Sequence, residues 1–445
     1  MHSDFVDKYN SFYFIGIGGV SMSALAQYLL GLGKQVGGSD VSANEYTDEL
    51  LKYGTKINFG NSEDDIENYD AVIYTDAIRE EDARLKKAAS LSKPTISRGK
   101  FLFEISKNFK KVIAISGCHG KTTCTAMLAH IFAAAGKKFA SHIGGRDLSF
   151  SNFYCCGYDY LITEACEYKK NFLHLRPDVA VILNSEIDHV ECYGSEEALK
   201  AAYLSFAGSA AQTVALYRDL PEIQCINFGF DKSADYFAAN IKMNEGICSF
   251  TVYEKAKKSG EIALKVHGKH NVLNALAATA VARYFDIPFD QIRLGLNSFV
   301  GVERRFEKLA EINGVKYFAD YAHHPNELRA SLKTAHRVTD GRLFVVFQPH
   351  TYSRTKLLFN QFVEVLSPLG DLLIYKTFAA REYYDDAGSA LTLSQSVKKA
   401  RYGDCPDDIS DFISKAENGD TVLFLGAGDI YFIAKKLCGE TEQNG

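Results

Sequence analysis

The sequence of 445 residues lacks several features that would assign it to a special class of protein. No CxxC pair is present and the ten cysteines have no regular spacing, which argues against a zinc site or a disulfide framework. Reduced thiols of a cytoplasmic protein are the simpler interpretation. The net charge of −5 gives no general attraction to nucleic acid or acidic membrane, so any anion site must be built locally. Internal repeats and low-complexity segments are also missing.

One stretch could be mistaken for a signal peptide or a membrane span. Residues 11–33 carry no formal charge, and Lys8 precedes them. Glycines and polar residues interrupt this stretch, however, so its composition is poor for a membrane span. A strand, a glycine turn and a helix explain it better. We therefore expect a cytoplasmic protein without membrane insertion.

The remaining composition is that of an ordinary globular protein. Hydrophobic residues make up 47% of the chain and charged residues 24%. The length suggests about three domains. Short apolar runs alternate with helical patterns almost throughout, which predicts an α/β fold with mostly parallel sheets. We expect the domains to comprise residues 1–107, 108–299 and 300–445.

The predicted elements alternate between strands and helices in each domain. In the first, a strand over Phe12–Ile17 leads through the turn Gly16–Gly19 into a helix over Ser21–Leu32. Further predicted strands are Gln35–Asp40, Asp70–Asp76, Thr95–Ser97, Val112–Ser116, Tyr158–Ala165, Asp178–Asn184, Tyr317–Ala319, Leu343–Phe347, Leu372–Tyr375 and Val422–Leu425. Further predicted helices are Glu80–Leu91, Lys121–Ala135 and Asn271–Phe285. The pattern between Phe237 and Val266 predicts a small antiparallel patch, and the tail after Lys436 is expected to fray.

A phosphate-binding turn is the most informative local feature. An apolar strand and an amphipathic helix flank the run Ser116-Gly117-Cys118-His119-Gly120-Lys121-Thr122-Thr123. Glycines let backbone N–H groups converge on phosphate oxygens, and the helix N-terminus adds a favourable dipole. Lys121 would neutralise the β and γ phosphates, and Thr122 offers its hydroxyl to Mg2+. The glycine spacing is shorter than in the common GxxxxGK[ST] loop, so a general NTPase does not follow automatically.

Acidic and polar residues follow two further strands, where the ligands of a bound metal would lie. Glu164 ends one strand, Glu167 comes three residues later, and the run Asn184-Ser185-Glu186-Ile187-Asp188-His189 follows the next strand. Strand ends beside one phosphate turn bring such groups to the same edge of a parallel sheet. Helix caps or solvated turn residues are the alternative interpretation of these acids.

The succession of motifs along the chain resembles the Mur ligases. The turn at residues 117–123 is similar to their GTxGKTT loop. Matching strings in all three domains, in the right order, are Glu164-Ala165-Cys166-Glu167-Tyr168, Gly268-Lys269-His270-Asn271-Val272-Leu273-Asn274-Ala275, Arg304-Arg305-Phe306, Asp320-Tyr321-Ala322-His323-His324-Pro325 and Gly426-Ala427-Gly428-Asp429-Ile430. The strings that resemble the alanine-adding branch of this family are Gly16-Ile17-Gly18-Gly19-Val20-Ser21-Met22-Ser23 and Gln348-Pro349-His350-Thr351-Tyr352-Ser353-Arg354.

The resemblance implies a Rossmann-like UDP-sugar-binding domain, a central P-loop ATPase-like domain with a mostly parallel sheet, and a C-terminal Rossmann-like α/β domain. The last domain would bind the amino acid and close on ATP. The implied reaction is ATP-dependent ligation of L-alanine to the lactyl carboxylate of UDP-N-acetylmuramate, through an acyl phosphate, in peptidoglycan precursor synthesis. The implied cofactors are ATP and Mg2+, with two ions during turnover. We expect these substrates as partners, no nucleic acid, and a monomer or weak homodimer.

The same resemblance assigns roles to individual residues. Lys121, Glu164 and His189 would be catalytic, and Thr122, Glu164 and His189 would hold Mg2+. The implied ATP-binding residues are Gly117, Cys118, His119, Gly120, Lys121, Thr122, Thr123, Asn271, Asn274, Arg305 and Asp320. Those implied for the UDP-sugar are Gly16, Gly18, Gly19, Ser39, Asp40 and His270, and those for L-alanine are Tyr321, His323, His350 and Arg354.

Three residues depart from the family pattern. Cys118 stands where many relatives have Thr, Ser21 where many have a third glycine, and Thr351 where many have Arg. The first two are small and should keep the backbone shape, whereas Thr351 removes a cation from the motif that reads the amino acid. Several other Mur ligases have a carbamylated lysine, and the corresponding position in this chain is Leu204. We therefore expect no such lysine here.

Three alternatives remain open at this point. A sister ligase that reattaches a recycled tripeptide to UDP-N-acetylmuramate would share the ATP machinery. An NAD-dependent oxidoreductase fits the first glycine turn, because such glycines suggest NAD or FAD as easily as UDP, but it leaves Lys121 unexplained. A non-catalytic nucleotide-binding regulator would not need intact Lys121, Glu164 and His189.

Overall fold

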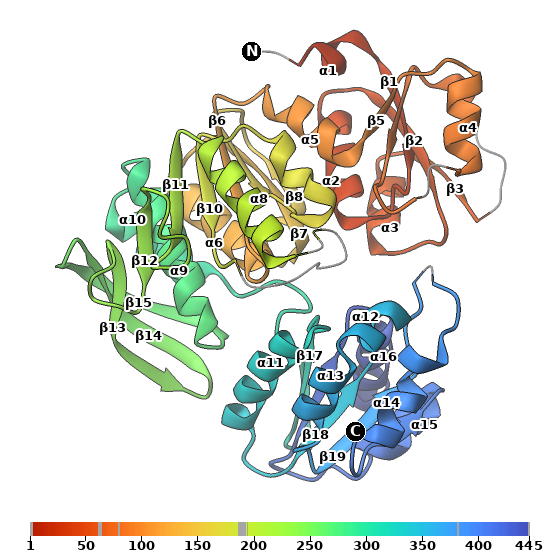
Figure 1. Ribbon diagram of the computed structural model, residues 1–445, viewed down its shortest axis with the longest axis vertical. Coiled ribbons are helices and arrows are strands. Elements are labelled where there is room, and N and C mark those ends of the chain that lie inside the picture. The colour runs from red at the N-terminus through yellow and green to blue at the C-terminus, as the bar shows by residue number, and fades with distance from the viewer. Residues whose placement is uncertain are drawn as a thin grey trace. The chain divides into compact units, whose positions relative to one another are not determined.

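The computed structural model of the chain alternates strands and helices in each part of the sequence (Figure 1). It describes residues 3–60, 65–78, 81–185, 193, 195–380 and 382–443. Within these residues the strands form three sheets, of five, ten and six strands. The predicted α/β class with mostly parallel sheets is confirmed. No helix in the described part of the chain is both long and apolar enough to cross a membrane.

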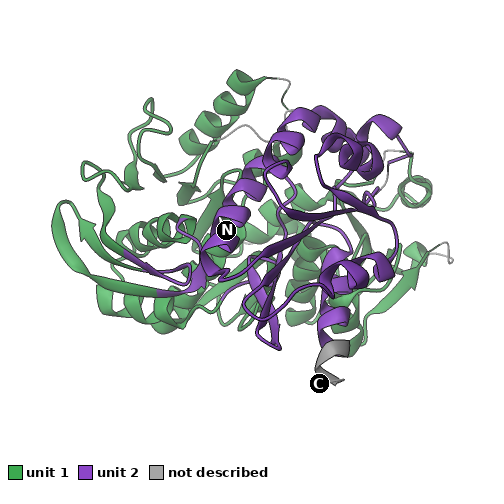
Figure 2. Cartoon of the chain, turned by 90° about the horizontal axis from the view of Figure 1, so that it is seen from below, with its two compact units in different colours: residues 1–241, 249–263, 270–300 green, residues 242–248, 264–269, 301–445 purple. Residues whose placement is uncertain are grey.

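The chain divides into two compact units (Figure 2). Unit 1 comprises residues 1–241, 249–263 and 270–300, and unit 2 comprises residues 242–248, 264–269 and 301–445. Unit 1 contains the five-stranded sheet and most of the ten-stranded sheet, whereas unit 2 contains the six-stranded sheet. The predicted domain boundary at residue 107 falls inside unit 1, and the domain limits stay a prediction.

The first sheet of unit 1 has the order β3-β2-β1-β4-β5 and is parallel throughout. β1 is fully buried, and the chain proceeds from it to both sides of the sheet, so a topological switch point lies at its carboxyl end. The strands are β1 (Ser11–Ile15), β2 (Gln35–Asp40), β3 (Lys56–Phe59), β4 (Ala71–Tyr74) and β5 (Thr95–Ser97). The helices are α1 (Asp4–Lys8), α2 (Val20–Gly31), α3 (Glu45–Lys52), η1 (Ile66–Asn68), α4 (Ala83–Ser90) and α5 (Arg98–Ser106).

The central sheet has the order β15-β14-β13-β12-β11-β10-β6-β9-β7-β8. Its pairs from β12–β13 to β9–β7 are parallel, and β8 is antiparallel to β7. The strands are β6 (Lys111–Ser116), β7 (Phe139–Asp147), β8 (Ser151–Cys155), β9 (Tyr160–Glu164), β10 (Val179–Ile182), β11 (Gln212–Leu216), β12 (Ile226–Gly229), β13 (Tyr236–Asn244), β14 (Ile247–Glu254) and β15 (Lys257–His267). The helices are α6 (Lys121–Ala134), η2 (Tyr168–His174), α8 (Glu196–Gly208), α9 (His270–Tyr284) and α10 (Phe289–Ser298).

Two tight turns connect β13, β14 and β15. Each turn has two residues with positive φ, Glu245 with Gly246 and Lys255 with Ala256. Such two-residue turns match the twist of paired antiparallel strands. The predicted antiparallel patch between Phe237 and Val266 therefore corresponds to these two hairpins.

The sheet of unit 2 has the order β16-β17-β21-β18-β19-β20, with only β16 antiparallel to its neighbour. Alternate residues of β18 and β21 enter two separate apolar cores, so both faces of these strands are buried. The strands are β16 (Glu307–Ile312), β17 (Val315–Asp320), β18 (Leu343–Phe347), β19 (Asp371–Tyr375), β20 (Arg401–Gly403) and β21 (Thr421–Leu425). The helices are α11 (Pro325–Val338), α12 (Tyr352–Leu357), α13 (Phe359–Leu366), η3 (Asp386–Gly388), α14 (Ala390–Ser396), α15 (Pro406–Ile413) and α16 (Ile430–Gln443).

Several parts of the fold differ from the sequence analysis, and the strands β3, β11, β12, β16 and β20 were not predicted. The strands β7 and β8 were not predicted, because glycines and polar residues interrupt their apolar pattern. The prediction of a frayed tail after Lys436 is wrong, since α16 continues to Gln443. By contrast, the bounds predicted for β2, β5 and β18 are those observed.

Close packing of α10 on α6 depends on Gly295. A Cβ atom at this position would lie 2.5 Å from the Cα of Ile131, which belongs to the backbone of α6. We expect Gly295→Ala to lower the free energy of unfolding by about 1–3 kcal/mol, because the two helices must move apart. Chemical unfolding of the full chain measures this change. Gly31→Ala is the control, because a Cβ there meets no atom within 4 Å; equal stability of the two variants would contradict the packing argument.

Candidate active site

The phosphate turn joins β6 to α6 through two glycines in left-handed backbone conformations. Gly117 has a φ of +133° and Gly120 a φ of +87°. A Cβ on Gly117 would lie 3.1 Å from the backbone of Asn184, and one on Gly120 would lie 2.5 Å from Oδ1 of Asn274. Glycine is therefore required at both positions by conformation and by space.

Asn184 holds the middle of this turn from the neighbouring strand. Its Oδ1 accepts a hydrogen bond from the N–H of His119 at 3.0 Å, and its Nδ2 donates to the carbonyl of His119 at 3.0 Å. Asn184 follows β10, which is parallel to β6. Sequence reasoning assigns Asn184 no individual role, and its position after a buried strand is the only signal that could have found it.

Two of the residues predicted to bind ATP, Asn271 and Asn274, lie in the first turns of α9. Asn274 donates from Nδ2 to Oδ1 of Asn271 at 2.9 Å, and both side chains are buried. The structure brings Asn274 against Gly120 of the phosphate turn. His270, predicted for the UDP-sugar, is the first residue of α9 and is exposed. Contact of these residues with a nucleotide stays a prediction.

The ammonium group of Lys121 lies among acceptors of the protein itself. It donates to Oε1 of Glu167 at 2.9 Å and to the carbonyl oxygens of Gly117 and Cys118. Burial alone would lower the pKa of Lys121, but the Glu167 carboxylate outweighs this effect, and the pKa is raised. Lys121 therefore carries its charge at neutral pH. Sequence reasoning also leaves Glu167 without a role, although it is fully buried beside the phosphate turn.

Two of the predicted metal ligands offer oxygen atoms close to this turn. Glu164 ends β9 in register with Ile115 of β6, and its Oε1 accepts from the N–H of Gly144 at 2.5 Å. Thr122 lies in the first turn of α6 and is buried. A carboxylate and a hydroxyl suit Mg2+, which prefers oxygen ligands, so these residues fit the implied ion. His189, predicted as a catalytic residue and metal ligand, lies outside the described residues.

The glycine turn after β1 lies at the switch point of the first sheet. Gly16 has a φ of +84°, and a Cβ there would lie 2.6 Å from the Thr75 side chain. The N–H of Gly18 donates to Oδ2 of Asp40 at 2.7 Å, and the carbonyl of Ser39 accepts from Gly16 at 2.8 Å. Gly19 caps α2. The structure thus brings together the residues predicted for the UDP-sugar in the first domain, and it shows Asp40 fixing the turn.

A second group of predicted residues lies at the carboxyl ends of β17 and β18 in unit 2. The guanidinium of Arg305 is 5.2 Å from the ring centre of Tyr321, and the Tyr321 and His323 ring centres are 5.3 Å apart. The ring centres of His323 and His350 are 5.7 Å apart, and Nη1 of Arg354 lies 3.3 Å from Nδ1 of His350. The four residues predicted for L-alanine therefore form one chain of contacts with Arg305.

Burial sets the protonation of two groups in this cluster. Together with the smaller effects of His323 and Arg354, it lowers the pKa of His350 to about 3. The ring is therefore neutral at pH 7, and Nδ1 accepts from Arg354 because a guanidinium only donates. Burial raises the pKa of Asp320 to about 6, although a hydrogen bond from Ser331 and the charge of Arg305 both lower it.

Thr351 occupies an unusual backbone conformation between His350 and α12. Its φ is +64° and its ψ is 144°, which a β-branched residue rarely adopts. The N–H of Thr351 donates to the carbonyl of Phe378 at 2.9 Å, and its hydroxyl accepts from the N–H of Arg354 at 3.4 Å. Thr351 therefore caps the helix that carries Arg354.

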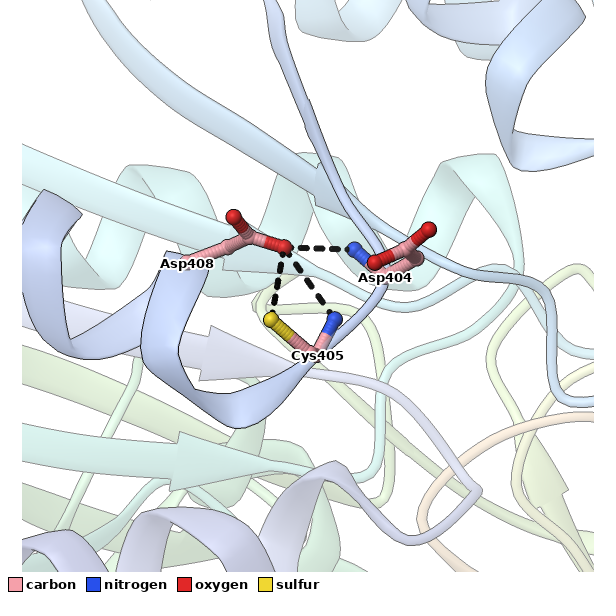
Figure 3. A group of neighbouring side chains, drawn as sticks. All are labelled: Asp404, Cys405 and Asp408. Atoms are coloured by element: carbon pink, nitrogen blue, oxygen red, sulfur yellow. Dashed lines mark hydrogen bonds between the residues drawn. The ribbon is translucent and has the colours of Figure 1, made fainter.

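A cluster at the N-terminus of α15 in unit 2 could be taken for a metal site. Asp404, Cys405 and Asp408 place possible ligand atoms within 4.8 Å of one another (Figure 3). However, one oxygen of Asp408 accepts from the N–H groups of Asp404 and Cys405 at 2.9 and 3.1 Å, and Sγ of Cys405 lies 3.2 Å away (Figure 3). These are the contacts of a helix N-terminal cap, and they account for the cluster without a metal.

The sequence matches models of three families of domain in succession. They are described as the Mur ligase family, catalytic domain at residues 11–110, the Mur ligase middle domain at residues 115–282, and the Mur ligase, glutamate ligase domain at residues 304–428. The matches cover most of the chain and extend over both units.

Similar proteins extend over the whole chain. A UDP-N-acetylmuramate–L-alanine ligase of Clostridium beijerinckii is 38% identical and covers 97% of this chain and 98% of its own length. One of Clostridium acetobutylicum is 39% identical, with coverages of 95% and 96%. The crystal structure of a UDP-N-acetylmuramate-alanine ligase from Thermotoga maritima matches with a TM-score of 0.86 at 28% identity, covering 98% of this chain and 100% of that chain. A murein peptide ligase from Psychrobacter arcticus shares the fold, with a TM-score of 0.75, 23% identity, and coverages of 97% and 98%.

The contacts of Asn184 predict a role in nucleotide binding. We expect Asn184→Ala to weaken binding of Mg–ATP by about tenfold, because two hydrogen bonds that hold the His119 peptide are lost. Isothermal titration calorimetry measures the affinity. Asn297→Ala is a matched control, since Asn297 also bonds a backbone N–H but lies on α10. Unchanged affinity in the Asn184 variant would show that the turn keeps its shape without this side chain.

The hydrogen bond from Ser331 predicts a change in the titration of Asp320. Removing this donor destabilises the carboxylate relative to the acid, so Ser331→Ala should raise the pKa of Asp320 above its value of about 6. Carbon NMR of labelled aspartate carboxyl groups measures the titration. Thr334→Ala, which removes a hydroxyl of α11 that bonds to the Ala330 carbonyl, should leave this pKa unchanged. A constant or lower pKa in Ser331→Ala would contradict the assignment.

Proposed function

The chain belongs to the Mur ligase family, and we propose that it joins L-alanine to the lactyl carboxylate of UDP-N-acetylmuramate. The reaction consumes ATP and yields UDP-N-acetylmuramoyl-L-alanine, ADP and phosphate for peptidoglycan synthesis. The observation that carries this proposal is the identity of 38–39% with alanine ligases over nearly the whole chain. The enzyme works in the cytoplasm, as a monomer or weak homodimer, without nucleic acid or membrane insertion.

A carboxylate is too poor an electrophile to condense with an amine in water, so it must first be activated. The lactyl carboxylate attacks the γ phosphate of ATP and becomes an acyl phosphate, with ADP as the leaving group. The amine of L-alanine then attacks the acyl carbon, and the tetrahedral intermediate expels phosphate. In the first step two anions meet, so positive charge and oriented N–H groups at the phosphates provide the main stabilisation.

Lys121 and the turn from Gly117 to Thr123 supply this stabilisation. Glu167 keeps Lys121 charged and holds its ammonium at the turn, where phosphate oxygens can replace the carbonyl groups of Gly117 and Cys118. Asn184 keeps the His119 peptide in place. Bound Mg2+ would neutralise phosphate charge, and Thr122, Glu164 and His189 are its proposed ligands. Asn271 and Asn274 would contact the adenine, and Arg305 and Asp320 are also proposed to bind ATP.

The cluster in unit 2 suits an amino acid. Arg354 is the cation for its carboxylate, because the guanidinium can donate two parallel hydrogen bonds. The neutral ring of His350 adds no positive charge that would repel the amine. Tyr321 and His323 complete the proposed pocket. Gly16, Gly18, Gly19, Ser39, Asp40 and His270 are proposed for the UDP-sugar.

Phosphate release tests this function directly. The full-length protein is incubated with UDP-N-acetylmuramate, ATP and Mg2+, and L-alanine, glycine, L-serine or a tripeptide is added in turn. We expect release that depends on L-alanine. No alanine-dependent release would refute the proposal, and a preference for the tripeptide would instead identify the sister ligase that recycles cell-wall peptide.

A variant of the phosphate turn extends this test. Lys121→Ala should reduce turnover to background while binding of the UDP-sugar stays nearly unchanged, because the lost charge lies at the phosphate turn, where the phosphates of ATP are proposed to bind. Lys110→Ala is the control, since this lysine is exposed and pairs with Asp159 at the surface. Retained turnover in Lys121→Ala would show that the phosphate turn has been assigned wrongly.

A further inference from the structure

A chain of polar contacts in unit 1 joins the glycine turn of the first sheet to the strand that ends at Glu164. Oγ of Ser21 lies 2.9 Å from Nε2 of His142, and Nδ1 of His142 lies 2.8 Å from Oγ1 of Thr163. Ser21 is in the first turn of α2, His142 in β7, and Thr163 in β9 directly before Glu164. His142 is 4% exposed and Thr163 is fully buried. Each polar atom of the histidine ring therefore has one partner within the protein.

The two ends of this chain fix the direction of every hydrogen bond. Nη1 of Arg98 lies 3.4 Å from Oγ of Ser21, and a guanidinium can only donate. At the other end, the hydroxyl of Thr163 donates to the carbonyl of Glu164 at 3.2 Å. Thr163 therefore accepts from Nδ1–H of His142, and when this is the only proton on the ring, Nε2 accepts from the hydroxyl of Ser21.

The surroundings of His142 agree with a neutral ring that has one proton. Burial and, to a smaller extent, the charge of Arg98 lower its pKa to about 3. A ring with both nitrogens protonated would leave Ser21 unable to donate its hydroxyl to Nε2. One arrangement of protons thus satisfies Arg98, Ser21, His142 and Thr163 together.

The strand β7 also contacts the carboxylate of Glu164. Two residues after His142, the N–H of Gly144 donates to Oε1 of Glu164 at 2.5 Å. The strand β7 therefore makes both contacts. His142 binds Ser21, which follows the glycine turn, and Gly144 binds Glu164. A glycine in place of Ser21 would have no hydroxyl for the first of these contacts.

We propose that Ser21 and His142 are positioning residues that hold the nucleotide-sugar turn in register with the carboxylate of Glu164. This inference rests on the proposed function, in which the turn binds the UDP-sugar and Glu164 holds the metal of ATP. The lactyl carboxylate and the γ phosphate react only when they are held within a near-attack distance, and small misplacements cost large factors in rate. The contact chain should therefore act on the chemical step more than on the binding of either substrate.

Two single variants and their combination test the hydrogen bond between Ser21 and the ring of His142. Ser21→Ala removes the hydroxyl, and His142→Asn keeps a donor near the position of Nδ1 but is too short to reach Ser21. We expect each variant to lower kcat by about tenfold. The KM values for the UDP-sugar and for ATP should change by less than about twofold. The double variant should be no slower than either single variant, because both changes break the same contact.

Ser141→Ala is the matched control for these variants. Ser141 is the neighbour of His142 in β7 and is also fully buried, but its hydroxyl has no hydrogen-bond partner among the described residues. Its kcat should equal that of the wild type. Unchanged kcat in both Ser21→Ala and His142→Asn would overturn the proposal, as would losses that add up in the double variant.

The proton on His142 provides a readout that does not depend on activity. Nitrogen NMR of the full-length protein with labelled histidine, with the signal assigned by its loss in His142→Asn, should show a proton on Nδ1 and none on Nε2. A proton on Nε2, or on both nitrogens, would overturn the contact chain. A wild type without alanine-dependent phosphate release would refute the proposed function, and the positioning role with it. If the wild type is active, the kcat values of the variants test the positioning role separately from the proposed function.

Discussion

The position of β6 between β9 and β10 is the constraint on which the unit 1 site depends. Because the three strands are parallel and in register, their carboxyl ends reach the same edge of the sheet. The phosphate turn leaves β6 at this edge, with Asn184 after β10 on one side and Glu164 after β9 on the other. Gly117 approaches the backbone of Asn184 so closely that the turn has little freedom. Neighbouring strands therefore fix the shape of the turn before any ligand is bound.

Burial lowers the pKa of a basic group in each unit, but the neighbouring charges lead to opposite outcomes. In unit 1, Lys121 is withdrawn from water but lies beside Glu167, and removing one member of a buried pair leaves an uncompensated charge. The ammonium therefore stays charged, as binding of phosphate requires. In unit 2, His350 lies beside Arg354 and loses its proton. Contact with an acid keeps Lys121 charged, whereas burial beside a guanidinium keeps His350 neutral, and both states suit the proposed binding of phosphate and of the amine.

Much of this fold could be predicted because buried parallel strands are short, continuous apolar runs. The run Leu-Phe-Val-Val-Phe of β18 is an example, and its bounds were predicted correctly. β7 could not be found in this way, because its His142 is a polar residue whose burial depends on partners distant in the sequence. The roles of Glu167 and Asn184 depend on which strands lie beside β6, and local sequence does not determine that order. The motifs identified the group around His350, but the protonation of its members follows from burial, which only the structure supplies.

The departures from the family pattern gain a physical meaning from their contacts. The thiol of Cys118 is buried 3.8 Å from the hydroxyl of Tyr203, so the residue that replaces threonine packs inside rather than facing a phosphate. Thr351 supplies no cation, yet it caps the helix of Arg354 and aligns that side chain with His350. A strained conformation at such a position persists only when the surrounding structure holds it, here through the carbonyl of Phe378. Thr351 therefore gives the helix of Arg354 a rigid support, and in the proposed function Arg354 binds the carboxylate of the amino acid.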